Sequence, residues 1–219
     1  MKRRLAVLLL GAVMAGLLFG CGEGPEKITQ AQSAKDAMNT AASIYLTGDL
    51  EAVNQKTDIL ADGKVAGRME ESGFFNTRWT VTAGDGTWFY MKIVTDEPIN
   101  EDTEEYVSGN TFGFYDEADN CLGYAQKRGF RGDTGSGYDY YFMDAEQNLK
   151  DYRMEETGEY FTDMEGNVIA RADSAMDFTG RTCHIQIDME KGSDARIDFM
   201  DKLPMYYEQL DELKFWHSN

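Results

Sequence analysis

The sequence predicts a mainly β protein, a single antiparallel meander of about ten to twelve strands with a helix before it and a helix after it. Turn signals of Asp, Asn and Gly recur between segments rich in β-forming residues. Those segments alternate apolar and polar residues, whereas both flanks of the meander show helical spacing. We expect the sheet to curve into a half-barrel or a barrel-like sheet within one domain.

The chain begins with the pattern of a secretory signal. Three cations, Lys2 to Arg4, precede an uncharged run from Leu5 to Phe19. This run of about 15 residues matches a signal core and is shorter than the roughly 20 residues that a spanning helix needs. Residues 1–20 are therefore predicted to be a signal peptide.

The signal ends in Leu18-Phe19-Gly20-Cys21, which resembles the lipobox of bacterial envelope lipoproteins. The resemblance implies that Cys21 is lipidated, becomes the mature N-terminus, and is followed by a polar tether over residues 21–28. The two acyl chains of a diacylglycerol anchor a protein far more firmly than one chain does. The expected location is the extracytoplasmic face of the cell membrane. The alternative is an ordinary secretory signal with an incidental cysteine.

The composition is strongly acidic. The net charge is −18, and loss of the three cations in residues 1–20 lowers it to −21. Such a chain does not bind nucleic acid through phosphates. An anionic membrane surface also repels it, so the membrane contact is expected to come from the lipid on Cys21 and not from a basic patch.

The folded domain is predicted to span residues 29–219 and to begin with a helix over about 29–43. Thr29 and Gln32 have the spacing of a capping box. Ala31, Ala34 and Met38 then recur at helical intervals and form a narrow face of small and apolar residues.

From about residue 44 the pattern is that of strands. Trp79 and Val81 share one face of their segment, as do Ile185 and Ile187, and "RIDF" at 196–199 continues the alternation. Six turn signals separate or follow these segments: "ADG" 61–63, "GDG" 84–86, "EADN" 117–120, "AEQN" 145–148, "MEGN" 164–167 and "KGSD" 191–194.

The chain ends in a second predicted helix, with Asp201 as its cap and Pro204 in its first turn. One face is apolar and the other charged. The apolar stripe consists of Leu203, Tyr206, Tyr207, Leu210 and Leu213, and the charged face of Glu208, Asp211, Glu212 and Lys214. We expect the stripe to pack on the sheet; a partner's groove or the hollow of a half-barrel is the alternative.

Three hairpins share the order aromatic, one residue, Asp, three residues, Asn, apolar residue. They are "FYDEADNCLGYA" 114–125, "FMDAEQNLKDYR" 142–153 and "FTDMEGNVIARA" 161–172. Such turns resemble the hairpins of tubby-like and LURP-one-related barrels, most closely over residues 160–188. The resemblance implies a barrel with its C-terminal helix inside and a membrane-linked role.

A second resemblance concerns the layout. A helix followed by a long meander on a lipid-tethered chain is similar to the LolA- and LppX-like lipoproteins. This similarity implies a curved half-barrel whose apolar concavity binds a lipidic ligand.

Motifs for catalysis are weak. Asp133-Thr134-Gly135-Ser136 has the letters of an aspartic-protease loop, but Arg131 and Gly132 precede it and no second copy exists. The only histidines are His184 and His217, and no nucleophile motif accompanies them. Acidic residues at 101–105 lack the spacing of a calcium loop. We expect no enzyme activity, cofactor or metal; a carboxylate-based hydrolase is the lesser alternative.

Two further groups are candidate sites. Cys121 and Cys183 form either a disulfide or a pair of free thiols. Tyr138, Tyr140 and Tyr141 offer more aromatic surface than one sheet face buries, which indicates a binding surface. The predicted function is non-catalytic binding of a hydrophobic ligand or an envelope protein.

Overall fold

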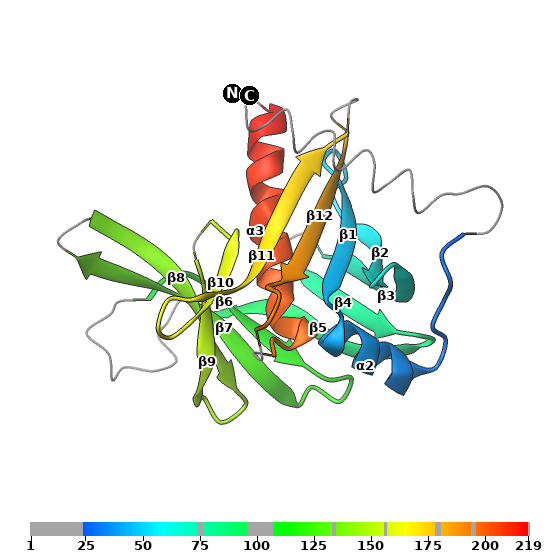
Figure 1. The fold of residues 1–219 in the computed structure, drawn as a ribbon, viewed down its shortest axis with the longest axis horizontal. Coiled ribbons are helices and arrows are strands. Elements are labelled where there is room, and N and C mark those ends of the chain that lie inside the picture. The colour runs from blue at the N-terminus through cyan, green and yellow to red at the C-terminus, as the bar shows by residue number, and fades with distance from the viewer. Residues whose placement is uncertain are drawn as a thin grey trace.

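The computed structural model describes residues 24–73, 77–95, 107–132, 135–155, 157–177, 181–193 and 196–218. Twelve antiparallel strands form a closed barrel around a helix (Figure 1). In chain order the elements are α2 (Ala31–Thr40), β1 (Ser43–Asp49), β2 (Lys56–Ala61), β3 (Lys64–Ser72), β4 (Arg78–Ala83), β5 (Gly86–Thr95), β6 (Val107–Tyr115), β7 (Cys121–Gly132), β8 (Gly135–Asp144), β9 (Leu149–Glu155), β10 (Tyr160–Asp163), β11 (Val168–Met176), β12 (Thr182–Met189) and α3 (Phe199–Ser218).

The structure confirms a mainly β meander with a helix at each end, and it corrects the half-barrel. Each strand pairs with its neighbours in sequence, and β1 also pairs with β12 from Ser43↔Asp188 to Asp49↔Thr182. This last ladder closes the sheet. Closure satisfies the main-chain groups of β1 and β12, which an open half-barrel would leave as two bare edges.

The predicted turns are formed as expected at five of the six positions, between β2 and β3, β4 and β5, β6 and β7, β8 and β9, and β10 and β11. Asp62 and Gly63 adopt φ values of 47° and 81°, as a two-residue hairpin turn requires. The sixth signal differs, because Lys191 and Gly192 follow β12 and lead towards α3.

The three Asp–Asn turns are built alike. In each, one Asp oxygen accepts the main-chain N–H groups two and four residues later, and the other accepts the Asn side-chain amide at 2.8 or 2.9 Å. The aspartates are Asp116, Asp144 and Asp163. Their pKa values lie below the usual range, chiefly because of the hydrogen bond from the Asn side chain.

The first helix is shorter than predicted. It begins after Gln30, whose side chain makes no capping bond, so the capping box of Thr29 and Gln32 is wrong. Instead the Thr29 carbonyl accepts the Asp85 N–H and ties the chain to the β4–β5 turn. Ala34 and Met38 are fully buried as predicted, and the helix lies over β2 to β5.

The C-terminal helix begins at Phe199, two residues before the predicted cap. Asp201 is therefore inside the first turn, and Pro204 lies beyond it. The Phe199 N–H donates to the side chain of Asn39 at the end of α2, which fixes where the helix starts. The predicted strand at 196–199 is wrong: Ile197 and Phe199 are buried, but they anchor the approach to the helix.

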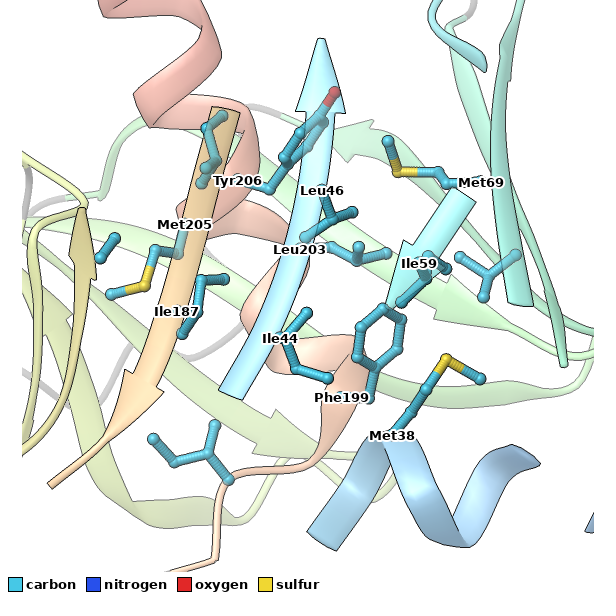
Figure 2. Close-up of a cluster of buried hydrophobic side chains, with 14 of the residues drawn as sticks. Met38, Ile44, Leu46, Ile59, Met69, Ile187, Phe199, Leu203, Met205 and Tyr206 are labelled. Carbon is cyan, nitrogen blue, oxygen red and sulfur yellow. The ribbon is translucent and has the colours of Figure 1, made fainter. Parts of the chain in front are cut away.

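Helix α3 runs inside the barrel and does not lie on one face of the sheet. Phe199 stacks on Trp88 of β5, Tyr207 meets Trp79 of β4, and the Tyr206 hydroxyl donates to the Thr47 carbonyl of β1. Figure 2 shows Leu203, Met205 and Tyr206 among side chains of the surrounding strands. A twelve-stranded barrel is too wide for its own side chains to fill, so the helix supplies the missing core.

The barrel has two different ends. We call the end that carries α2, the Asp–Asn turns and the start of α3 the base. We call the opposite end, where the last turns of α3 emerge, the mouth (Figure 1). Phe215 and Trp216 near the helix end are exposed at the mouth.

Candidate functional site

The lumen of the barrel is occupied by α3. Buried side chains of the helix, among them Leu203 and Met205, join the same apolar core as strand residues such as Ile44 and Ile187. Gly48 of β1 allows this close packing, because a Cβ there would lie 2.7 Å from both the Leu210 side chain and the Cys183 sulfur. The space that a lipophilic ligand would need inside the barrel is thus filled by the chain itself.

An ionic cluster fastens the start of α3 to β9 at the base. The fully buried Asp201 carboxylate accepts a hydrogen bond from the Tyr152 hydroxyl and lies 2.6 Å from the Lys150 amine, which also contacts Asp198 at 2.8 Å. Burial raises the pKa of Asp201 to about 6, against the opposing effect of Lys150. Burial lowers the pKa of Lys150, but the two carboxylates outweigh it and the net pKa is raised.

Lys202, the next residue of α3, is buried without such a cluster. Its side chain is 2% exposed, and no hydrogen bond or ion pair joins it to any residue that the structure describes. Burial lowers the pKa of Lys202 to about 8, although Asp198, Asp62 and Asp201 act in the opposite direction. The base therefore holds a charged group at a cost in stability.

This cluster is a structural anchor. Asp201 and Tyr152 are buried in the core, and one Asp201 oxygen contacts both the Tyr152 hydroxyl and the Lys150 amine, whereas the other oxygen has no hydrogen-bond partner among the described residues. A substrate has no access to a carboxylate in that position. Within the described ranges, no three His, Cys, Asp or Glu side chains are grouped so that they could hold a metal ion.

The mouth is different, because the barrel wall is split there. The ladder between β10 and β11 extends only from Thr162↔Val168 to Tyr160↔Arg171, and β11 continues to Met176 beside β12. A hollow of about 210 Å³ lies at this split. Its lining comprises Glu159, Tyr160, Arg171, Ala172, Asp173, Ser174 and Gln209.

Gln209 of α3 joins the two sides of the split from inside the barrel. Its amide nitrogen donates to the Thr157 carbonyl at 2.8 Å, on the segment that leads into β10. Its amide oxygen accepts from the Ser174 hydroxyl of β11 at 2.7 Å. The floor of the hollow is thus a buried, fully bonded amide.

The three predicted binding tyrosines are separated by the alternation of β8. Tyr140 points into the lumen and donates to Glu208 of α3, and Tyr141 lies on the outer face near the Arg128 guanidinium, 5.2 Å from its ring centre. Both are buried, so neither forms an exposed surface; Tyr138 is half-buried. Glu208, predicted to lie in water, is half-buried and 3.8 Å from Lys127.

The two cysteines inside the domain carry free thiols. Cys121 begins β7 and is half-buried, whereas Cys183 is buried in β12, and these strands are not neighbours in the barrel. Burial raises the pKa of Cys183 to about 11, which keeps it a thiol. His184 beside it lies on the opposite, outer face and hydrogen-bonds to the Tyr45 hydroxyl.

Several predicted features lie outside the described residues. Cys21 and the signal peptide are among them, as are the acidic stretch at 101–105 and the Asp133-Thr134 pair. The glycines on either side of that pair, Gly132 and Gly135, end β7 and begin β8.

The hollow could not be located from the sequence, and the place of α3 inside the barrel was implied only by the tubby-like resemblance and by one alternative for the apolar stripe. The signal for the hollow is a difference in strand length, four residues in β10 against nine in β11. The sequence shows only an aromatic pair and a turn at this point. Gln209 stands on the boundary of the charged helix face, where nothing distinguishes it.

Comparisons with known proteins give no relatives: no family model matches the chain, and no curated protein or solved structure is significantly similar to it. Among the helices that the structure describes, none has both the length and the apolar character needed to cross a bilayer.

Proposed function

We propose that this protein is a non-catalytic lipoprotein of the extracytoplasmic membrane face that binds a partner protein through its mouth. The observation that supports this choice is the filled lumen. A barrel that carried a lipidic ligand would need an apolar cavity, and α3 takes up that space with side chains such as Leu203 and Tyr206. The exposed aromatic side chains Phe215 and Trp216 are at the mouth.

The described chain begins near the base, so a lipid on Cys21 would attach on the side away from the mouth. Lys27 pairs with Val65 next to the turn at the base, and Cys21 precedes it by six residues, a span of at most about 20 Å. Helix α3, with 20 residues, is about 30 Å long and leads from the base to the mouth. A lipid on Cys21 would therefore hold the base near the membrane and turn the mouth away from it.

The anchor is tested by replacing Cys21 with serine and fractionating the cells. We expect the C21S protein to lose its acyl label and either leave the membrane fraction or stay unprocessed. Cys121→Ser, which changes a thiol within the domain, is the matched control and should leave labelling intact. A C21S protein that is still processed, acylated and membrane-bound would rule out the lipobox.

The partner-binding role is tested with a photo-crosslinking residue in place of Trp216 at the mouth or Lys35 on α2 at the base. Crosslinks to a distinct protein are expected from the mouth position. Equal yields from both positions, or products only from the base, would contradict the proposed orientation.

A tubby-like barrel with a membrane-linked role is the second candidate. A closed barrel of twelve strands with its last helix inside favours this resemblance over a LolA-like half-barrel. Direct membrane contact is tested with the C21S chain and vesicles containing phosphatidylserine. Flotation of the protein with these vesicles would favour the membrane-linked role, and its absence would favour attachment by lipid alone.

A further inference from the structure

The split leaves the end of β11 without a ladder partner on one side among the residues that the structure describes. The Ala172 N–H donates to the Glu159 carbonyl at 2.8 Å. This side of β11 therefore faces the segment that leads into β10. Every second residue of a strand directs its main-chain groups to the same side. The main-chain groups of Ser174 and Met176 therefore also face the split, beyond the last β10 pair at Tyr160↔Arg171.

This edge is short and held in place, and its residues Ser174 and Met176 are half-buried. β12 pairs with β11 on its other side as far as Met176↔Cys183, so the strand cannot collapse into the gap. Gln209 fixes the width of the split by bonding both Thr157 and Ser174. An unpaired edge that is held extended is a template for a further strand.

The rim of the hollow is acidic. The side chains of Glu159 and Asp173 are exposed, and neither carboxylate forms a hydrogen bond or ion pair with another described residue. Arg171, the cation of the rim, is already engaged by Glu190 of the β12 end. The aromatic ring of Tyr160 lies beside these charges, with the Arg171 guanidinium 5.8 Å from its centre.

We propose that the split between β10 and β11 binds an extended peptide segment of the partner, which adds a strand to β11 and places a lysine or arginine side chain between Glu159 and Asp173. Main-chain bonds to Ser174 and Met176 supply the strand pairing, and the two carboxylates select the basic side chain. This inference deepens the proposed partner binding by assigning the partner's chemistry.

Charge argues for a foreign peptide over a second copy of this chain. Two copies joined edge to edge through β11 would bring Glu159 and Asp173 of one against the same acidic rim of the other. Like charges facing each other across an interface oppose association. A segment with a basic side chain meets no such repulsion.

The test uses the full chain in detergent micelles and a synthetic probe, acetyl-Thr-Val-Lys-Val-Thr-amide, with its glutamate analogue as the matched control. Amide hydrogen exchange is followed at Ser174 and Met176. We expect the lysine peptide to slow exchange at both amides at least about tenfold, and the glutamate peptide to bind about tenfold more weakly, since a charge mismatch of about 1.4 kcal/mol suffices for that factor.

A charge-reversal variant provides the second test of the proposal. The double variant Glu159→Lys and Asp173→Lys should lose the lysine peptide and keep its melting temperature, because both residues are exposed. Glu146→Lys, on the β8–β9 turn at the base, should change neither. Exchange unaffected by the lysine peptide, or slowed equally by both peptides, would overturn the proposal. So would a wild-type dimer in sedimentation that the double variant abolishes. Crosslinking from Trp216 is independent of these results, so the two proposals can fail separately.

Discussion

The base and the mouth of the same barrel handle polar groups in opposite ways. At the base, the buried Asp201 and Tyr152 form a bonded cluster with the half-buried Lys150, and α2 packs over strands β2 to β5. At the mouth, Glu159 and Asp173 stay in water beside an incomplete ladder. The strands are the same ones, so the difference comes from what covers each end. The base buries charged groups in contacts within the chain, whereas the mouth leaves carboxylates exposed.

Removing α3 should have the largest effect, because the helix supplies core side chains to the inside of the barrel. Deleting 202–219 exposes several large core side chains, each contributing about 1.5–3 kcal/mol, from a domain of about 5–15 kcal/mol total stability. We expect no cooperative thermal unfolding by circular dichroism. Deleting only 215–219, the exposed tip, should leave the transition in place. A melt of the long deletion that overlays the full chain would show that the lumen does not need the helix.

Removing one polar side chain at each end should lower the unfolding free energy by different amounts. Asp201→Ala at the base leaves Lys150 and Tyr152 without their buried partner and is expected to lower the unfolding free energy by about 3 kcal/mol. Gln209→Ala at the mouth removes two bonds near solvent and should cost about 1 kcal/mol. Urea titration of both variants measures the difference, and equal losses would remove the distinction between the ends.

Because of Lys202, the stability of the protein should rise in alkaline solution. Its pKa is lowered to about 8 in the folded state, so the charged amine costs stability below that pH, and the cost fades as pH rises from 8 towards 10. Lys202→Met should raise the melting temperature at pH 7 and abolish the rise between pH 8 and 9.5. Lys150→Met, which removes a paired amine, should be destabilising instead. A destabilised K202M protein would mean that the buried amine has a bonded role.

The Asp–Asn turns should contribute less to the stability of the fold, since their carboxylates are exposed. Their lowered pKa values mean that the ionised form is favoured by folding, so this stability is present above about pH 4 and is lost as pH falls through the folded pKa. Asp163→Ala should lower the melting temperature slightly at pH 7 and not at all near pH 2. Asp163→Asn, which keeps an acceptor, should fall between the two. A shift in melting temperature that is independent of pH would assign the effect to the turn backbone.

The smallest effect on stability is expected at the helix tip. Phe215→Ala and Trp216→Ala change side chains that are 62% and 61% exposed, so each should shift the unfolding free energy by less than about 0.5 kcal/mol. Differential scanning calorimetry is sensitive enough to show this. A larger loss would mean that the tip packs against the mouth in solution.

Local patterns predicted the strands well, because turns and alternation are local properties. Trp79 and Val81 are buried on one face as expected, and the Asp–Asn motif identified three turns with the same hydrogen bonds. The C-terminal helix was predicted, but its place inside the barrel was only an alternative, because its apolar stripe accounts for one side of the helix. The strands that surround the helix are set by the closure between β1 and β12, which pairs Ser43 with Asp188. These two residues are far apart in the sequence.

The polar contacts were harder to predict, because they also join residues that are far apart in the sequence. Asp201 finds its partners Lys150 and Tyr152 about fifty residues away, so the sequence offered only a capping role. Tyr140 and Tyr141 lie on opposite faces of β8, and each is covered by a group from another element, Glu208 of α3 and Arg128 of β7. The split in the wall depends on where a ladder stops, which no local signal marks.

The position of α3 in the chain has a consequence for folding. The helix that fills the barrel follows all twelve strands, and the closing ladder joins segments about 140 residues apart. Hairpins can form early, but closure around a core has to wait for the last segment to be synthesised. Such long-range topology folds slowly. The barrel therefore stays open until α3 has been synthesised.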